Sequence, residues 1–398
     1  MKIGLYIHIP FCKRKCPYCD FNSYAGLDAL QISYVEALTA EMSWLARQRE
    51  WQANTVFIGG GTPTVLPLSL LTRVLDTVHA QFHVPDGAEI TVEANPGTVD
   101  ETYLAGLRAA GVNRLSLGVQ SFHNDELRLL GRIHTAAESK AAFRAARRAG
   151  FQNVNLDLIY GLPEQSLERW QVTLEQALSL SPEHFSLYCL TVEKGTPFAE
   201  WVARGDLAQP DDDLAAEMYE LAGEMLKADY FHYEVSNWAR RTMPDPQFTI
   251  CHSPFICQHN VVYWRNEAYL GLGAGAHSSW EGRRWHNLLS PQSYVVRMAA
   301  QSKGDAPWQS PVVEDMEVIG ESLAMGETMM LGLRLLEEGV PLARFSERFG
   351  RSLLDVYRDE VATLQGVGLL ERGPECVRLT RRGRLLGNQV FARFLPDV

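Results

Sequence analysis

The chain has 398 residues, 46% of them hydrophobic, which is enough for one large domain and a smaller one. Its net charge of −11 argues against a surface built mainly for nucleic acid, and seven cysteines are too few for a disulfide scaffold of this length. No apolar run reaches the roughly 18 residues of a membrane span and no apolar leader opens the chain, so the sequence predicts a soluble cytoplasmic protein.

Strand-like apolar stretches alternate with amphipathic helical patterns in the first half of the chain. We expect strands at 3–9, 55–58, 89–93, 114–118, 154–158 and 185–190. Between them we expect helices at 33–48, 68–82, from 100 onward with Asp100 as N-cap, 136–149 and 167–180. This alternation predicts a parallel sheet with right-handed crossovers, and six units are too few for a closed eight-stranded barrel.

Three cysteines follow the first expected strand with the spacing C-x3-C-x2-C, namely Cys12, Cys16 and Cys19. Thiolates this close fit around one small metal centre. A [4Fe–4S] cluster usually takes four cysteines, so three leave one iron open to a small molecule. A structural zinc ion normally has four protein ligands, and no fourth lies nearby. The spacing therefore predicts an iron–sulfur cluster with one open iron, in a reducing compartment.

Polar groups stand at or just past the ends of the following strands. The run Gly59-Gly60-Gly61-Thr62-Pro63 follows the second strand, and Glu93, Gln120, Arg132 and Asp157 follow later ones. Ligands of parallel sheets bind at the carboxyl ends of the strands, so these groups predict one shared pocket. The alternative for any single carboxylate is that it caps the next helix.

The cysteine spacing after a strand that ends His8-Ile9-Pro10-Phe11 resembles the signature of radical S-adenosylmethionine (SAM) proteins, in which SAM chelates the open iron. Later motifs resemble the branch that holds oxygen-independent coproporphyrinogen III oxidases (HemN) and the related haem chaperones (HemW). The resemblance covers most of the chain. It implies an open, partial (β/α)6 TIM-like barrel and a [4Fe–4S] cluster on Cys12, Cys16 and Cys19. The residues that match SAM contacts are Tyr6, Gly60, Gly61, Thr62, Glu93, Gln120, Arg132 and Asp157.

The second half of the chain is less regular. Residues 240–256, which include Cys251, form an expected loop about three times the usual connection length. A helix is expected at 315–335, followed by further helices and by short strands near 369–371 and 377–379. This order resembles a winged helix, as in HemN-type C-terminal domains.

These patterns predict three regions. They are a radical SAM core at 1–235, a connecting region at 236–305 and a mostly helical, winged-helix-like C-terminal domain at 306–398.

The connecting region contains His259-Asn260-Val261-Val262-Tyr263-Trp264, which looks like the HNxxYW motif associated with HemW. A neutral imidazole is a common haem-iron ligand, so His259 is a candidate ligand with Tyr263 and Trp264 as walls of the haem site. One alternative is a structural histidine that is buried and hydrogen-bonded. A second is Cys257, which as a thiolate is a rival axial ligand.

Two further features separate the relatives within this branch. Decarboxylating HemN-like enzymes carry a further cysteine two residues past the third cluster cysteine, where this chain has Phe21. They also have an N-terminal extension before the cluster strand, whereas Tyr6 here lies five residues after Met1. The resemblance therefore implies a haem chaperone that binds a [4Fe–4S] cluster, SAM and haem, with no residue assigned a catalytic role.

The expected partners of such a carrier are haem-accepting proteins, among them membrane-bound respiratory enzymes, and an electron donor to the cluster, but no nucleic acid. One alternative is a coproporphyrinogen III oxidase-like enzyme of porphyrin biosynthesis, so whether the chain is an enzyme stays open. Another is radical-SAM modification of RNA, for which the sequence shows no appended RNA-binding module.

Overall fold

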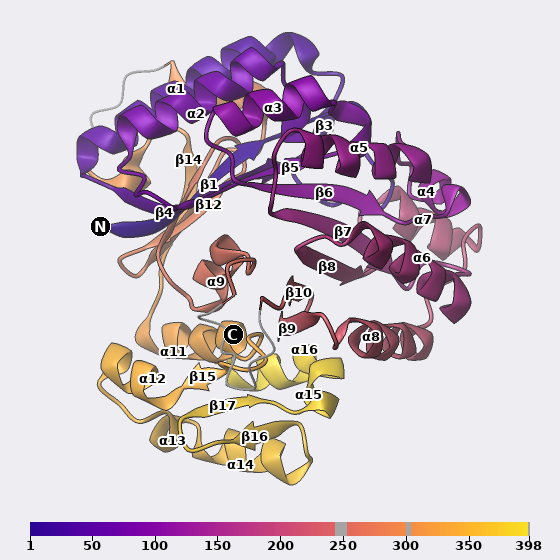
Figure 1. Cartoon of the computed structure of the whole chain (residues 1–398). Coiled ribbons are helices and arrows are strands. Elements are labelled where there is room, and N and C mark those ends of the chain that lie inside the picture. The colour runs from indigo at the N-terminus through magenta and orange to yellow at the C-terminus, as the bar shows by residue number, and fades with distance from the viewer. Residues whose placement is uncertain (243–252, 300–303, 397–398) are drawn as a thin grey trace.

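The computed structural model describes residues 1–242, 253–299 and 304–396. It combines a large mixed sheet, with helices on its outer side, and a smaller C-terminal domain (Figure 1). Most of the loop expected at 240–256, including Cys251, lies outside the described residues. None of the helices in the described part of the chain has the length and apolar character that a membrane crossing requires.

Six parallel strands form the centre of the sheet. In chain order they are β1 (Lys2–Ile9), β4 (Gln52–Gly60), β5 (Glu89–Ala94), β6 (Arg114–Gln120), β7 (Val154–Tyr160) and β8 (His184–Cys189). Each pairs in parallel with the next, which confirms the six predicted strands. Their apolar residues are almost fully buried because a parallel sheet is covered on both faces.

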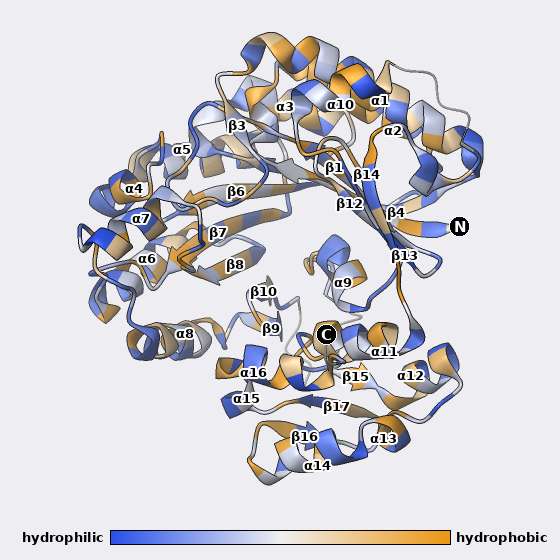
Figure 2. Cartoon of the chain, turned by 180° about the vertical axis from the view of Figure 1, so that it is seen from behind, coloured by the Kyte–Doolittle hydropathy of each residue, from blue (hydrophilic) through white to orange (hydrophobic). Residues whose placement is uncertain are grey.

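Amphipathic helices cover the outer face of these strands, and α9 (Gln258–Trp264) lies on the inner side (Figure 1). Figure 2 shows hydrophilic and hydrophobic residues side by side along these outer helices. The carboxylate of Asp100 accepts from the amide of Tyr103 at 2.8 Å, which confirms the predicted N-cap of α3. The outer helices are α1 (Gln31–Gln48), α2 (Leu68–Gln81), α3 (Glu101–Ala109), α4 (Asn124–Leu129), α5 (Ala136–Arg148), α6 (Leu167–Leu180), α7 (Pro197–Arg204) and α8 (Asp212–Leu226).

The sheet extends beyond the six predicted strands to twelve. Next to β1 lie β11 (Tyr269–Leu272, parallel), β12 (His277–Trp280), β13 (Arg283–Asn287) and β14 (Val313–Val318). Beyond β8 lie the antiparallel strands β10 (Asn237–Arg240) and β9 (Tyr230–Glu234). Helix α10 (Pro291–Met298) lies between β13 and β14 in the chain.

The helix predicted at 315–335 is wrong in its first part. Val313–Val318 forms β14, which pairs antiparallel with β13, and α11 (Glu321–Gly332) begins only after it. The conformation of this segment is set by backbone pairing with a distant strand, and the side-chain pattern did not reveal that pairing.

The predicted boundary between residues 235 and 236 falls inside the β9–β10 hairpin. Strands on both sides of it belong to one sheet, and one hydrophobic core runs from Ile3 to residues of the predicted connecting region such as Tyr294. The division into a core and a connecting region stays a prediction.

The C-terminal region has its own core, which runs from Met325 to Phe394. A helix, a strand, helices and a two-stranded hairpin follow one another here, as in a winged helix, and the three strands pair in the order β15-β17-β16. The elements after α11 are β15 (Val340–Pro341), α12 (Leu342–Phe349), α13 (Leu353–Val356), α14 (Arg358–Gly366), β16 (Leu370–Arg372), β17 (Cys376–Leu379), α15 (Arg381–Leu385) and α16 (Gly387–Phe391).

Candidate functional site

The cysteine loop connects β1 to α1 and is held at both ends. Its first residues form β2 (Phe11–Cys12), which pairs with β3 (Tyr24–Ala25). The side-chain amide of Asn22 donates to the carbonyls of Ala274 and Leu289, both at 3.0 Å. The strand pairing and the two bonds from Asn22 together hold the cysteine loop in place.

The three predicted cluster cysteines line one cavity of about 380 Å³ at the carboxyl ends of the strands. The thiol of Cys12 lies 3.7 Å from the hydroxyl of Thr62, and the guanidinium of Arg132 donates to Cys16 Sγ at 3.6 Å. Burial raises the pKa of Cys12 and of Cys19. Iron binds thiolates, so we expect loading of the site to release protons.

The three thiols share one cavity and stay the predicted ligands of a cluster. Among the residues that the structure describes, no three His, Cys, Asp or Glu side chains are placed to hold one metal ion. A [4Fe–4S] cluster places each of its thiolates on a different iron. Arg132 adds a fixed positive charge that favours the anionic cysteines.

The glycine run after β4 packs directly against the cysteine loop. A Cβ atom on Gly61 would lie 2.7 Å from the carbonyl oxygen of Phe11 and 3.0 Å from Cys12 Sγ. Gly60 has φ +115°, and a Cβ there would lie 2.6 Å from the ring of His8. Only glycine fits at these two positions, so the backbone forms one wall of the cavity.

Two partly buried carboxylates face the same cavity. Glu93 accepts from the amide of Gly60 at 3.1 Å, and Asp157 accepts from Ser116 at 3.0 Å and from Asn155 at 2.8 Å. Burial raises the pKa of Glu93 to about 8, and the charge of Asp157 adds to the rise. Burial also raises the pKa of Asp157. A cationic or hydroxyl-rich ligand would satisfy both groups.

Gln120 and Arg132 each keep a buried polar atom without a hydrogen-bond partner among the described residues. These atoms are Gln120 Oε1 and Arg132 Nε. Gln120 has φ +68° and lies where the register between β6 and β7 shifts. This irregular backbone lies at the edge of the cavity. A ligand that offers one donor and one acceptor would pair both atoms.

Tyr6 is the one SAM-matching residue that does not line this cavity. Its hydroxyl hydrogen-bonds to Nδ1 of His8 at 2.9 Å, and the other ring nitrogen of His8 binds the carbonyl of Asn22 at 2.8 Å. Burial lowers the pKa of His8 to about 4, so the imidazole is neutral at pH 7. In this structure Tyr6 supports the cysteine loop through His8.

The raised pKa of Glu93 predicts a pH effect on stability. Between an unfolded pKa of about 4.3 and the folded value of about 8, the folded chain holds a proton that the unfolded chain has lost, so stability falls as the pH rises. We expect Glu93→Gln to reduce this fall between pH 5 and 8 by about 3 kcal/mol, measured by denaturant unfolding of the cluster-free protein. If the stability of both proteins changed with pH in the same way, the raised pKa of Glu93 would be contradicted.

His259 lies away from the cysteines, in the interior beside the amino ends of β1 and β4. Its side chain is 1% exposed. Nδ1 hydrogen-bonds to the hydroxyl of Thr55 at 2.8 Å and Nε2 to the hydroxyl of Tyr263 at 2.9 Å. Burial, followed by the charge of Arg114, lowers the pKa of His259 to about 3. Both nitrogens are therefore used within the protein, as in the structural alternative.

The other residues of this motif are also packed. Tyr263 stands edge-on to His259, with ring centroids 5.0 Å apart. Trp264 lies under the guanidinium of Arg334 at 5.1 Å, which ties α9 to the C-terminal domain. Cys257 is buried, and burial raises the pKa of its thiol to about 12. Haem contact by any of these residues stays a prediction.

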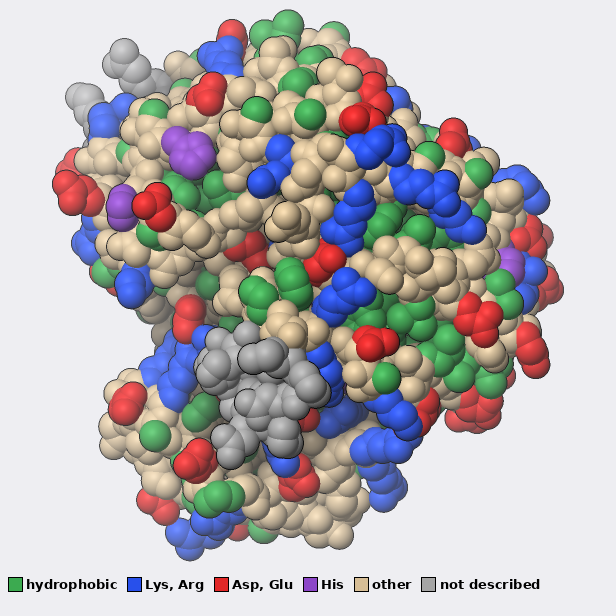
Figure 3. Space-filling model, viewed as in Figure 1, with side chains coloured by type: hydrophobic (Ala, Val, Ile, Leu, Met, Phe, Trp, Pro, Cys, Tyr) green, Lys and Arg blue, Asp and Glu red, His purple; other side chains and the backbone are tan. Residues whose placement is uncertain are grey.

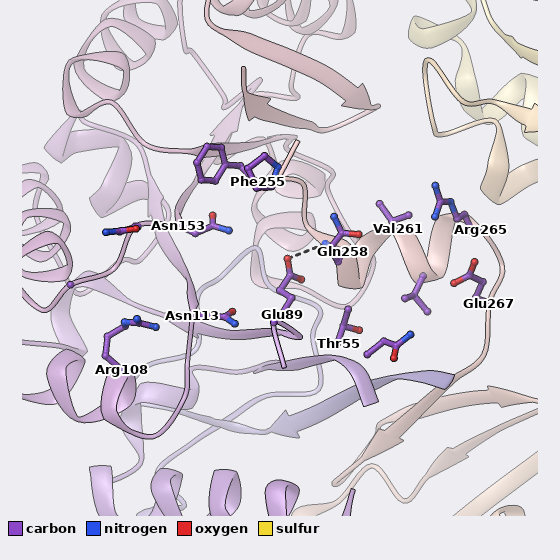
Figure 4. Close-up of a pocket in the computed structure, with 16 residues that line it drawn as sticks. Thr55, Glu89, Arg108, Asn113, Asn153, Phe255, Gln258, Val261, Arg265 and Glu267 are labelled. Carbon is purple, nitrogen blue, oxygen red and sulfur yellow. Dashed lines mark hydrogen bonds between the residues drawn. The ribbon is translucent and has the colours of Figure 1, made fainter. Parts of the chain in front are cut away.

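No local pattern in the sequence indicated that Glu89 holds α9 in place. Its carboxylate accepts from the amide of Gln258 at 3.0 Å (Figure 4). It also accepts from the amide of His259 at 3.1 Å. Glu89 and Gln258 border a second cavity of about 640 Å³, whose lining includes the carboxamide side chains of Asn113 and Asn153. The cavity lies at the amino ends of the strands, the end of such barrels that serves stability rather than chemistry.

Sequence reasoning also missed Ser116 and Tyr188, which line the cysteine cavity. Ser116 precedes Gly118 by two residues on β6, so strand alternation places it on the same face and could have revealed it. Tyr188 has no such local signal. Phe21 lines the cavity as well and is 64% exposed.

Comparison with known families agrees with this geometry. The radical SAM superfamily model matches residues 6–177, and the HemN C-terminal domain model matches residues 324–386. The structure resembles that of coproporphyrinogen III oxidase (HemN) from Escherichia coli, with a TM-score of 0.81 and 23% sequence identity. The match covers 100% of this chain and 90% of that one, which shows a shared fold. Fold and site thus define a radical SAM protein, a class whose cofactors are a [4Fe–4S] cluster and SAM.

Similar curated proteins narrow the class. The chain is 39% identical to the haem chaperone HemW of Bacillus subtilis, with 99% of both chains covered. It is 36% identical to HemW of Escherichia coli over 99% of this chain and 98% of that one. A mitochondrial radical SAM domain-containing protein 1 of Danio rerio is 33% identical. The chain belongs to the HemW family of radical SAM proteins.

Proposed function

We propose that the protein is a haem chaperone that binds haem and passes it to haem-accepting proteins. The observation that carries this proposal is the identity of 39% to a haem chaperone over the whole length of both chains. Phe21, at the position of the further cysteine of decarboxylating relatives, agrees with a carrier rather than an oxidase. Membrane-bound respiratory enzymes are the proposed recipients, and a reducing cytoplasm is the proposed compartment.

Cys12, Cys16 and Cys19 would hold the cluster, which supplies one-electron chemistry and an open iron for SAM. Arg132 would pair with the SAM carboxylate, and its unpaired Nε leaves a donor for that contact. Glu93 and Asp157 would accept hydrogen bonds from the amino group and the ribose hydroxyls. The backbone of Gly60, Gly61 and Thr62 would form the wall beside the methionine part, and Gln120 would take a remaining donor.

For haem, the proposed contacts are His259, Tyr263 and Trp264. The side chain of His259 reaches an iron only if its bonds to Thr55 and Tyr263 give way, so the proposal requires α9 to move. That requirement makes the His259 variants in the Discussion decisive for the location of haem.

The test of the carrier proposal compares it with the oxidase alternative. Anaerobically reconstituted protein is given SAM, a reductant and coproporphyrinogen III, and separately one equivalent of haem. We expect a Soret band that saturates at about one haem per chain and no loss of carboxyl groups as CO2. Conversion of coproporphyrinogen III to protoporphyrinogen IX would favour the oxidase.

RNA modification is the less favoured function. Both basic and acidic side chains occur on the face shown in Figure 3. Several arginines form ion pairs with carboxylates. Arg378, for example, binds both Glu371 and Glu337. Arginines that are neutralised in this way are less available to the phosphates of a nucleic acid.

A further inference from the structure

A chain of hydrogen bonds connects Asp157 with the start of α9 through the interior of the barrel. Asn155 donates to Asp157 Oδ1 at 2.8 Å, and its Oδ1 lies 2.6 Å from Nδ1 of His184. The other ring nitrogen of His184 lies 2.9 Å from the hydroxyl of Tyr233. That hydroxyl accepts from the amide of Cys257 at 3.3 Å. The side chains of Asn155, His184 and Tyr233 are at most 1% exposed.

The direction of every bond in this chain follows from its two ends. Asp157 only accepts as a carboxylate, so Asn155 must present its NH2 group to it and its carbonyl oxygen to His184. His184 Nδ1 then carries the proton and donates, and Nε2 accepts from the Tyr233 hydroxyl. Burial lowers the pKa of His184 far below its usual value, so the ring stays neutral with this single tautomer. All donors point toward Asp157.

We propose that His184 and Tyr233 are positioning residues for Asp157, which hold this carboxylate in the orientation that SAM requires and tie it to the first turn of α9. Among the described residues, Asn155 and Ser116 donate to Asp157, and a side-chain hydrogen bond with Ser186 also counteracts the rise of its pKa. The amide of Asn155 is also bonded to two hydroxyls, since its NH2 group donates to Ser116 at 2.7 Å and its Oδ1 accepts from Ser186 at 3.2 Å. The bond from His184, at 2.6 Å, is the shortest one that holds this oxygen away from the carboxylate. This inference rests on the proposed SAM site.

The same contacts link the SAM cavity to the proposed haem motif. Cys257 precedes α9, and its amide is the last donor of the chain. The carboxylate of Glu89 holds the next two amides. A change in the position of α9 would therefore reach Asp157 through three buried side chains, all fixed by directed bonds.

Two substitutions of His184 separate the positioning role from simple burial. The amide nitrogen of His184→Asn can replace Nδ1 and keep the bond to Asn155, whereas the amide of His184→Gln can replace only Nε2 and keep the bond to Tyr233. We expect SAM to bind about tenfold more weakly to His184→Gln and within about twofold of the native affinity to His184→Asn. SAM binding is measured by its effect on the EPR signal of the reduced cluster, at equal iron content and after comparison of melting temperatures.

Tyr233→Phe provides a second measurement that conserves volume if neither His184 variant folds. It removes the hydroxyl that donates to Nε2 of His184 and accepts from the amide of Cys257, and we expect SAM to bind about threefold more weakly. Equal weakening in His184→Asn and His184→Gln would overturn the proposal, as would native SAM affinity in His184→Gln or in Tyr233→Phe. Asp157→Ala separates failure of the SAM site from failure of the positioning role. If Asp157→Ala also binds SAM normally, the proposed SAM site is wrong. If Asp157→Ala binds SAM weakly while the His184 and Tyr233 variants bind it normally, only the positioning role is wrong.

Discussion

Replacing any one of Cys12, Cys16 or Cys19 with alanine abolishes the iron–sulfur absorption of the anaerobically reconstituted protein. The native chain is expected to hold about four irons and four sulfides. Three protein ligands are already one fewer than the usual four, so a site with two cannot retain the cluster. The measurement is iron and sulfide content together with the visible absorption of the cluster.

Cys376→Ala is the matched control for these variants. Cys376 lies on β17 in the C-terminal domain, away from the cavity that the three cysteines line. Cys189→Ala is a stricter control, because Cys189 borders the cavity but belongs to β8 rather than to the loop. Both should retain native iron. Retention of a full cluster in all three loop variants would refute the assignment.

His259→Ala is expected to lower the free energy of unfolding by about 3 kcal/mol. The change removes a ring that is 1% exposed and leaves the hydroxyls of Thr55 and Tyr263 without their partners. Tyr263→Phe is the milder control, since it removes one hydrogen bond and keeps the ring, with an expected loss of about 1 kcal/mol. Denaturant unfolding of both variants measures the difference.

The same variants locate haem. If His259 is the axial ligand after movement of α9, His259→Ala shifts the Soret band or weakens haem binding, whereas Tyr263→Phe retains it. Loss of the band in Cys257→Ala alone would assign the ligand to sulfur, although the raised pKa of Cys257 opposes a thiolate. Native haem binding in all of these variants would place haem elsewhere and leave the motif a structural one.

The sequence predicted the central strands and most of the cavity because both depend on local patterns. Apolar alternation defined β1 and β4 to β8, and the rule that ligands gather at strand carboxyl ends then brought Glu93, Gln120 and Asp157 together with the cysteines. Tyr6 was also expected to line the cavity, but it does not, because its hydroxyl is bound to His8.

The additional strands and the interior polar groups were not predictable in this way. β11 pairs with β1 across more than 260 residues, as between Gly4 and Tyr269, and such a short strand has no periodicity of its own. Likewise, Glu89 meets the amides of α9 across about 170 residues of chain. A single charged residue on a strand gives no local sign of a partner so distant in the sequence.

Transfer of haem tests the central claim most directly. The reconstituted protein, loaded with one equivalent of haem and given SAM, is mixed with an apo-haemoprotein and separated from it by size. As a chaperone it must give up its Soret band while the acceptor gains its own, faster than free haem enters the same acceptor in the presence of a scavenger. Haem that stays bound, or that moves only through the solvent, would contradict a carrier function.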